Sequence, residues 1–457
     1  MKKNVTAVFD IGKTNKKFFL FDADYQEVYR EYSSFEQIED EDGHPTEDLN
    51  ALKTWLQDLF DRMLKEKEYN ITAINFSTYG ASLVHLDENG EVLTPLYNYT
   101  KPLDQKVVDS FFEKYGPELD FSVATGSDNS GMLNSGLQLY WLKYSKPEVF
   151  KKIRYSLHLP QYISFVFTGI PISEYTSIGC HTALWDYRKQ DYHDWVYKEG
   201  FYKIFPPIVS TGTSINMNYH GKRMSIGVGI HDSSSALLPY IRSADEKFIL
   251  VSTGTWSISL NPFSEQNLTD EDVKSGCINY MRVNGKPVKA ARLFLGNEYN
   301  LQVKKLSDHF KVSPDYHKEV KFNKEIYLKI INDFELCFNW IGIHDEKMPD
   351  ATKIPYDDFE NAYHQLMVEL ALLQVKNVQI AASGEKIDNL FIDGGFSDNE
   401  VYVKLLSHYL KEMELRTTDS SLGSALGAAL ILTDTKLDTE FLRKNYSLKK
   451  HVPFIIS

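Results

Sequence analysis

One strand–turn–strand pattern occurs twice in this chain, near its start and again just past its middle. Residues 5–22, VTAVFDIGKTNKKFFLFD, read as two apolar strands joined by a polar turn, and residues 247–262, KFILVSTGTWSISLNP, repeat that arrangement. Self-similarity of this kind indicates a duplicated unit. The chain of 457 residues has room for two domains. We predict them at residues 1–243 and 244–457, divided where charged and turn residues follow Tyr240.

The segments that follow each hairpin also correspond in type. The first half continues with a strand at 27–32, an amphipathic helix at about 47–67 and a strand at 71–77, and residues 103–205 read as mostly helical. The second half has a long helix at 359–382, a strand at 389–393, a helix at 399–410 and a last helix from about Ser421. This combination favours an α/β fold, with a mixed sheet covered by helices in each half.

The two hairpin turns have the composition of a phosphate site. Both contain glycine and threonine, so backbone N–H groups and hydroxyls converge where no large side chain blocks approach. Asp10, at the end of the first strand, could hold Mg²⁺ through water, and Lys17 could neutralise phosphate charge. The alternative is a pair of ordinary β-hairpins.

Two glycine-containing segments lie near the C-terminus. In FIDGGFSDN, a strand runs into a double glycine and then a helix, a geometry that lets the backbone approach a nucleotide closely. In SLGSALGAALIL, Gly423 and Gly427 share one helical face and favour close helix packing. Two common nucleotide motifs are excluded. Ala7 stands where a P-loop requires glycine, and Asp232 stands where a dinucleotide fingerprint requires its third glycine.

Between the halves lies GVGIHDSSSALLPY, in which Asp232 comes directly before a helical run of small residues. As a helix N-cap, its carboxylate would accept a backbone N–H bond. As a general base at the cleft between the domains, it would take a proton from a substrate hydroxyl. Both roles are compatible with one residue. His231 is interpreted as a substrate or packing contact, because no second histidine stands at metal-ligand spacing.

Charge and cysteine content limit the partners. The chain has 63 acidic and 50 basic residues and a net charge of −13, so its field repels nucleic acid and anionic membranes, and we predict neither as a partner. The three cysteines lie far apart, which fits no disulfide framework.

Asp10 interrupts the N-terminal apolar run before a signal peptide could form, and no apolar stretch approaches the length of a membrane span. We therefore predict an unexported, cytoplasmic protein.

Several segments, in order along nearly the whole chain, resemble the FGGY family of carbohydrate kinases. DIGKTNKK resembles the family's first phosphate segment, GIHDSSSA its catalytic-aspartate segment, STGTWSISL its second phosphate segment, and DGGFSDN with SLGSALGAA its adenosine segment. LPQYISFVFTG also resembles a helix and turn of the family. The resemblance implies two duplicated ribonuclease-H-like domains of the actin/hexokinase type, with ATP and a sugar meeting in the inter-domain cleft.

The resemblance also implies a reaction, transfer of the γ-phosphoryl group from Mg²⁺-ATP to a sugar hydroxyl, with ATP and Mg²⁺ as cofactors. Asp232 would be the catalytic base, and Asp10 and Asp232 would surround Mg²⁺. The nucleotide contacts would be Gly12, Lys13, Thr14, Asn15, Lys17, Gly254, Thr255, Gly394, Gly395 and Asn399. The sugar contacts would be Gly80, Ser82, Asn98, Glu174, His231 and Asp232. The expected partners are the sugar and ATP, with a homodimer as a candidate assembly.

Within the family, the HDSSSA, STGTW and STYG segments are most similar to rhamnulose and fuculose kinases, so we predict a ketose such as L-rhamnulose or L-fuculose as the acceptor. Two positions depart from those kinases. Ser82 stands where they usually carry a sugar-binding aspartate, and Arg292 lies near another expected contact. The alternatives are a kinase of another pentulose or a polyol, or a non-kinase ATP switch of the same fold. Such a switch would have no need of a sugar-facing base at Asp232.

Overall fold

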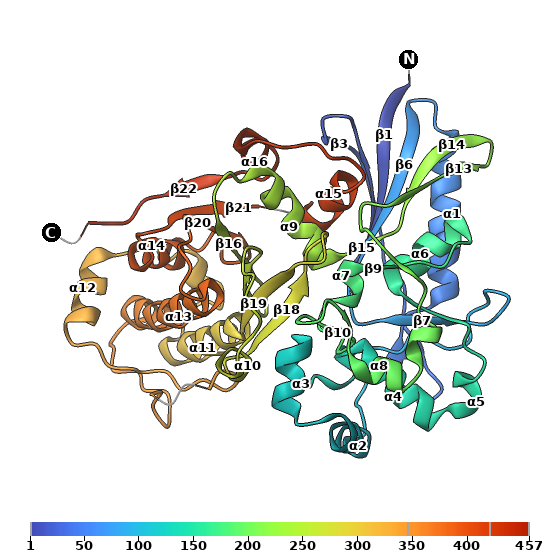
Figure 1. Cartoon of the computed structure of the whole chain (residues 1–457). Coiled ribbons are helices and arrows are strands. Elements are labelled where there is room, and N and C mark those ends of the chain that lie inside the picture. Colours follow the sequence, from blue (N-terminus) through green and yellow to red (C-terminus); the bar gives the residue numbers. More distant parts are fainter. Residues whose placement is uncertain (1, 345–346, 420–421, 456–457) are drawn as a thin grey trace.

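Two mixed β-sheets form the framework of the chain. The computed structural model describes residues 2–344, 347–419 and 422–455, and within these ranges each sheet has seven strands. Figure 1 shows the sheets side by side, one built by each half of the chain. The first contains β1 (Lys3–Ile11), β2 (Lys16–Phe21), β3 (Glu27–Ser33), β6 (Tyr69–Thr78), β13 (Ser214–Tyr219), β14 (Lys222–Gly227) and β15 (Ile230–His231). The second contains β16 (Phe248–Thr253), β17 (Ser257–Asn261), β18 (Cys277–Met281), β19 (Pro287–Leu293), β20 (Asn389–Gly394), β21 (Glu414–Thr418) and β22 (Lys449–His451).

The two sheets share one topology at their centres. In the first sheet β3, β2, β1, β6 and β14 are neighbours in that order, and in the second β19, β17, β16, β20 and β21 take the same places. In both, the first three strands pair antiparallel and the next two join in parallel. This confirms the duplicated α/β fold that the repeated hairpins predict.

Helices cover the sheets and fill the space beside them. Those of the first half are α1 (Leu49–Lys65), α2 (Gln105–Tyr115), α3 (Glu118–Thr125), α4 (Ser135–Ser145), α5 (Pro147–Phe150), α6 (Leu159–Thr168), α7 (Tyr175–Ile178), α8 (Asp194–Lys198) and α9 (Asp232–Ser243). Those of the second are α10 (Asp270–Lys274), α11 (Leu295–Phe310), α12 (Lys324–Asn332), α13 (Phe359–Ala382), α14 (Glu400–Tyr409), α15 (Gly423–Leu430) and α16 (Thr439–Asn445). Short strand pairs link the first-half helices: β4 (Ile38–Glu39) with β5 (Pro45–Thr46), β7 (Leu83–Leu86) with β8 (Tyr155–His158), β9 (Ser173–Glu174) with β12 (Ile208–Val209), and β10 (Trp185–Asp186) with β11 (Asp191–Tyr192).

The predicted long helices are present. The segments at 47–67, 359–382 and 399–410 form α1, α13 and α14. In α1, Asp48 caps the N-terminus by accepting bonds from the N–H groups of Asn50 and Ala51, and leucines on one face are buried against the first sheet. Ser421, the predicted start of the last helix, lies outside the described residues.

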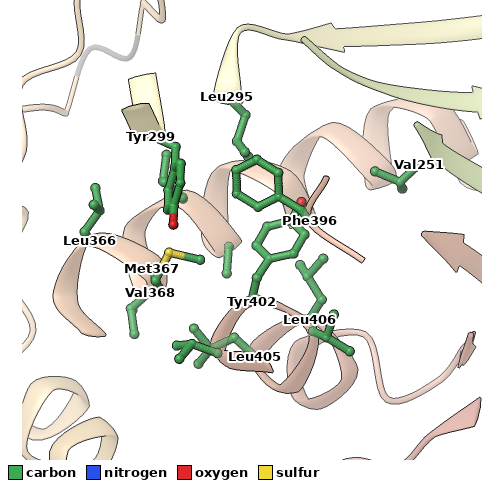
Figure 2. Close-up of a cluster of buried hydrophobic side chains, with 14 of the residues drawn as sticks. Val251, Leu295, Tyr299, Leu366, Met367, Val368, Phe396, Tyr402, Leu405 and Leu406 are labelled. Carbon is green, nitrogen blue, oxygen red and sulfur yellow. The ribbon is translucent and has the colours of Figure 1, made fainter. Parts of the chain in front are cut away.

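The long helix α13 forms the centre of the core in the second half. Its Leu366, Met367 and Val368 belong to one buried cluster with side chains of α14 (Figure 2). Phe396 joins this cluster and packs on Tyr299, with ring centroids 4.9 Å apart. Because Phe396 follows the double glycine directly, the core holds that glycine turn in place.

The two halves meet through α9 and α15, which lie between the sheets (Figure 1). A Cβ atom on Gly427 would lie 1.9 Å from the carbonyl oxygen of Ser235, so only glycine allows this approach. The Ser235 hydroxyl donates to the carbonyl of Ser424 at 2.6 Å. The close helix packing predicted from the glycine pair is therefore confirmed at Gly427.

A second contact joins the helical region of the first half to β18 and β19. The Asn279 N–H donates to the carbonyl oxygen of Gly126 at 2.8 Å. The guanidinium of Arg292 lies 2.6 Å from the carboxylate of Asp128. Arg292, which the sequence places near a sugar contact, thus forms an ion pair that ties the two halves together.

Two further observations concern the predicted exclusions. Among the described residues, no helix combines the length and apolar character that a membrane span needs. All three cysteines are buried and free of disulfides, which agrees with the interpretation of their spacing. The predicted domain boundary falls between Ser243, where α9 ends, and Phe248, where β16 begins.

Candidate active site

A cavity of about 280 Å³ lies between the two halves. Both hairpins, α9 and the start of α15 contribute to its wall, so elements from the two sheets face one space. The lining residues are Lys17, Asp232, Ser233 and Ala236 from the first half and Leu250, Ser252, Ile258, Leu260, Tyr280, Asp393, Gly423 and Ser424 from the second.

Asp10 lies behind this wall at the end of β1, bonded to two of the lining residues. Its carboxylate accepts a hydrogen bond from the Ser424 hydroxyl at 2.9 Å and lies 3.9 Å from the Lys17 ammonium. Burial raises the pKa of Asp10 to about 6; Lys17 opposes this shift, and the charge of Asp232 adds to it. Two carboxylates that repel each other in a partly buried cleft favour a bound cation.

Asp232 projects into the cavity from the first residue of α9, with 34% of its side chain exposed. Its Oδ1 accepts a bond from the Ser233 hydroxyl and lies 3.2 Å from His231 Nε2. His231, not Asp232, occupies the N-cap position of α9. Desolvation by the cleft walls raises the pKa of Asp232 to about 6. A carboxylate with this pKa is ionised at neutral pH and can take a proton from a hydroxyl.

The turn of the first hairpin presents a polar edge. Thr14 and Asn15 are exposed, and the Gly12 N–H donates to the Asn15 carbonyl at 3.0 Å. Lys17 leaves this turn on the same side as its cross-strand partner Asp10. Of the predicted phosphate residues of this hairpin, Lys17 lines the cavity and Thr14 and Asn15 are exposed at the turn. The ammonium of Lys13 lies over the rings of Tyr79 and Tyr99.

The second hairpin and the double-glycine turn are joined by hydrogen bonds. The Thr253 hydroxyl donates to the Asp393 carbonyl at 2.6 Å and accepts from the Phe396 N–H at 3.0 Å. Gly394 has a φ of +88°, and a Cβ there would lie 2.0 Å from the Thr253 carbonyl oxygen. Gly254 and Thr255 are exposed at the tip. The two predicted nucleotide segments thus form one surface.

A second cavity, of about 370 Å³, adjoins this surface and fits a nucleoside in size. Its wall consists of Tyr299, His317, Lys318, Val320, Lys321, Gly395, Phe396, Asp398, Asn399 and Glu400. Open space surrounds the position of a Cβ on Gly395. The Asn399 side chain caps α14 and donates to the Tyr363 hydroxyl at 2.9 Å. Asn399 therefore shapes the wall, while Gly395 leaves the cavity open.

The predicted sugar contacts divide into two groups. Gly80 lies against His231, since a Cβ on Gly80 would be 2.9 Å from His231 Nε2. His231 is buried, and burial lowers its pKa to about 3, so the ring is neutral. Its Nδ1 has no hydrogen-bond partner within the part of the chain that the structure describes. Gly80, His231 and Asp232 therefore form one wall beside the cavity.

The other predicted sugar contacts are engaged within the protein. Glu174 is fully buried and caps α7, accepting bonds from the N–H groups of Thr176 and Ser177. Asn98 donates to the Pro45 carbonyl at 2.9 Å, and Ser82 is buried. None of these three lines the 280 Å³ cavity. Their roles as sugar contacts stay predictions.

Three residues near Asp232 were not predicted. Ser424 bonds Asp10, and the charge of Asp232 contributes to the raised pKa values of Tyr99 and Tyr280. Ser424 stands inside a segment that the sequence assigns to helix packing. Tyr280 comes from β18 of the opposite half, and nothing in its local sequence signals that it reaches Asp232.

The acid residues of the cleft fit Mg²⁺. No group of three His, Cys, Asp or Glu side chains at metal-binding distance occurs among the described residues. Mg²⁺ does not require one, because it usually keeps several waters and takes one or two carboxylates together with substrate phosphates. Asp10 and Asp232, both with raised pKa values, are the predicted donors for that mode.

Two sheets of one topology around a cleft with paired carboxylates define a protein of the actin/hexokinase-like fold. The chain belongs to the FGGY family of carbohydrate kinases. The model of the family's N-terminal domain matches residues 5–238, and that of its C-terminal domain matches residues 245–440.

Individual relatives are distant. A rhamnulokinase of Halalkalibacterium halodurans is 26% identical, over 56% of this chain and 56% of that protein, so the match spans little more than half of the relative. A rhamnulokinase of Mannheimia succiniciproducens is 24% identical over 87% of this chain and 83% of the relative. A carbohydrate kinase structure from Novosphingobium aromaticivorans superposes with a TM-score of 0.83 at 23% identity, over 99% of this chain and 95% of that one. At this identity the structural likeness concerns the fold.

Proposed function

We propose that this protein is an ATP-dependent carbohydrate kinase that transfers the γ-phosphoryl group of Mg²⁺-ATP to a sugar hydroxyl. One observation carries the proposal: Asp232 and Lys17 line a cavity whose opposite wall comes from the second hairpin and the double-glycine strand. A base, a cation and the two nucleotide segments thus face the same space. Family membership supports the same reaction.

Asp232 is the proposed general base. It takes the proton of the sugar hydroxyl as that oxygen forms its bond to the γ-phosphorus, and the bond from the γ-phosphorus to the oxygen bridging it to the β-phosphate breaks, releasing ADP. In-line transfer of this kind depends mostly on positioning and on neutralising charge. Exclusion of water by the closed halves would limit wasteful ATP hydrolysis.

The nucleotide is proposed to lie across the second half. Its adenosine would occupy the 370 Å³ cavity beside Gly395, and its phosphates would run past the tip at Gly254 and Thr255 toward Lys17. Mg²⁺, when bound, would neutralise phosphate charge, and Asp10 and Asp232 would hold it. The Ser424 hydroxyl orients the Asp10 carboxylate through their 2.9 Å bond.

The proposed acceptor is a ketose such as L-rhamnulose or L-fuculose. The names of the two relatives support rhamnulose, and the HDSSSA and STGTW segments support both sugars. Ser82 and Arg292 depart from the expected pattern. A preference for another pentulose or a polyol is therefore an outcome that the test must be able to reveal.

The cellular location is proposed from the use of ATP and from the free cysteines. A kinase that consumes ATP works where ATP is made, so we place the protein in the cytoplasm, where its three free cysteines would stay reduced. A homodimer is the proposed assembly, with the sugar and ATP as partners.

A coupled ADP-release screen tests the proposal. The purified protein is supplied with Mg²⁺-ATP and a panel of ketoses, aldoses and polyols, and the Asp232→Asn variant serves as the matched control. We expect ADP release that depends on one class of sugar and is lost in the variant. ADP release that is the same without any sugar would instead identify an ATP switch.

A further inference from the structure

The first hairpin carries three lysines, which lie in three different environments. Lys16 is buried, and its ammonium donates to the carbonyls of Gly12 and Lys13, both at 3.1 Å, and pairs with Glu47 at 2.9 Å. Lys17 faces Asp10 and lines the cavity between the halves. Lys16 therefore stabilises the turn, and Lys17 is the lysine that faces the nucleotide side.

Lys13 lies in a different environment from Lys17. Its Nζ lies 5.1 Å from the ring centroid of Tyr79 and 5.0 Å from that of Tyr99, within the range of cation–π attraction. Its side chain is 25% exposed. The two rings thus hold the ammonium at a partly exposed position.

The ammonium of Lys13 keeps unused donors. The nearest carboxylate oxygen, Glu47 Oε1, is 3.7 Å away, which is longer than a hydrogen bond. Glu47 is already engaged, because it accepts from the Tyr79 hydroxyl at 2.8 Å and pairs with Lys16. Burial lowers the pKa of Lys13, and the Glu47 carboxylate opposes this shift only in part. An added oxygen acceptor would therefore stabilise Lys13.

The two tyrosines that face Lys13 lie near the proposed sugar contacts. Tyr79 directly precedes Gly80, which lies against His231. Tyr99 senses the charges of both Asp232 and Glu47, which raise its pKa after the effect of burial. Tyr99 thus lies within electrostatic reach of the proposed base and of the carboxylate beside Lys13.

We propose that Lys13 binds an oxygen of the acceptor sugar and does not contact the phosphates of ATP. This inference rests on the proposed kinase function and deepens it, because it assigns a residue that selects the acceptor. The N–H donors of Lys13 reach a sugar oxygen on the wall of Tyr79 and Tyr99, while Lys17 alone of the hairpin lysines contacts phosphate. The sequence pattern by itself groups Lys13 with the phosphate contacts.

Lys13→Met and Lys17→Met are compared in steady-state kinetics, with Lys53→Met on the exposed face of α1 as the matched control. For Lys13→Met we expect kcat/KM for the best sugar to fall by about tenfold or more, as when a hydrogen bond from a charged group is lost. The KM for Mg²⁺-ATP and the ADP affinity measured by calorimetry should stay unchanged. Lys17→Met should instead weaken the affinity for ADP and raise the KM for Mg²⁺-ATP. Lys53→Met should leave all three quantities unchanged.

Two outcomes would overturn the inference. One is a loss of ADP or Mg²⁺-ATP affinity in Lys13→Met that matches the loss in Lys17→Met, and the other is unchanged sugar kinetics. Thermal melting checks the fold, and Lys13→Gln replaces Lys13→Met in the same comparison if the methionine variant does not fold. Failure of the kinase proposal is recognised separately, since the unaltered protein would then release no sugar-dependent ADP.

Discussion

The two hairpins occupy the same place in two sheets of one topology, yet their side chains are opposite in character. In the first, Asp10 pairs across the strands with Lys17; in the second, the corresponding partners are Ser252 and Ile258. Lys17, Ser252 and Ile258 all line the cavity between the halves. One backbone pattern thus supplies charge from one side and a neutral surface from the other.

The acid of the second half stands on a different strand. In the first sheet, Asp10 of β1 lies beside Ser77 of β6; in the second, Ser252 of β16 lies beside Asp393 of β20. Both halves thus have a serine beside an aspartate at the ends of the two central strands. The aspartate is on the first of these strands in one half and on the second in the other half. On the proposed function, the first half would supply the base and Lys17, and the second half would supply most of the nucleotide contacts.

The largest expected effect is on the general base. Asp232→Asn should lower kcat by about 10²–10⁴-fold, because an amide cannot accept the proton. The affinity for ADP should stay nearly the same, since Asp232 is not among the proposed contacts to adenosine or phosphate. Turnover and ADP calorimetry on one protein sample measure both. A variant that keeps most of its turnover would remove Asp232 from the role of base.

The next prediction makes the first hairpin resemble the second. Asp10→Ser removes a proposed Mg²⁺ donor and leaves Lys17 without its partner, so kcat should fall by about 100-fold, an effect of the order of losing one electrostatic contact in a catalytic site. The Mg²⁺ concentration needed for half-maximal rate should rise. Ser252→Ala is the matched control in the second hairpin and should change kcat little. Equal losses in the two variants would contradict the division of labour.

A third prediction separates folding from nucleotide binding within the double glycine. Gly394→Ala should lower the free energy of unfolding by at least about 2 kcal/mol, because the left-handed backbone and the close Thr253 carbonyl both oppose a Cβ. Gly395→Ala meets open space, so its melting temperature should stay unchanged while ADP binding weakens as the new methyl group enters the cavity. Thermal melting and calorimetry distinguish the two. A stable Gly394→Ala variant would contradict the packing argument.

The two carboxylates of the first half also predict a pH dependence. Asp10 and Asp232 have pKa values of about 6, so kcat/KM should fall about tenfold or more per pH unit below 6 as they gain protons. Their effect on stability has the opposite sign. The folded state binds these protons more tightly than the unfolded state, so their contribution to stability falls as pH rises from about 4 to 6. A pH profile flat down to about pH 5 would show that neither carboxylate must be ionised.

The smallest effect concerns the acceptor. Ser82→Asp introduces the acid that the resemblance to rhamnulose and fuculose kinases implies at this position. It should change the ranking of ketose epimers by kcat/KM, with little change in kcat for the best sugar. A new charged acceptor near a hydroxyl discriminates between epimers that present or lack it. The same panel is measured with both proteins. An unchanged ranking would mean that Ser82, which is buried, does not face the sugar.

Much of the fold could be predicted from patterns within short segments of the sequence. The segment 359–382 forms α13 over that whole range, because its apolar spacing and the cap at Asp358 act within one helix. The repeated hairpins predicted the duplication for the same reason. The region 103–205 was harder to predict, because its helices are short and alternate with strands. One of them, β8, pairs with β7, which lies far earlier in the sequence.

Only part of the candidate site could be predicted from the sequence. Asp10 and Asp232 could be predicted because one stands near the end of a strand and the other at the start of a helix. Lys17 could be predicted because it follows the polar turn of the same hairpin. Ser424 and Tyr280 were missed, because they reach the same cavity from distant elements of the other half.

The three hairpin lysines separate what the sequence determines from what only the tertiary structure determines. The sequence by itself determined that a polar turn with Lys13, Lys16 and Lys17 joins two strands, since strand periodicity and turn residues act over a few positions. Strand alternation also determined that Lys16 and Lys17 point to opposite faces. Only the tertiary structure decided what each face meets, because Glu47, Tyr79 and Tyr99 come from segments far along the chain. The pKa values of Asp10 and Asp232 have the same origin, since desolvation depends on which distant residues close over a carboxylate.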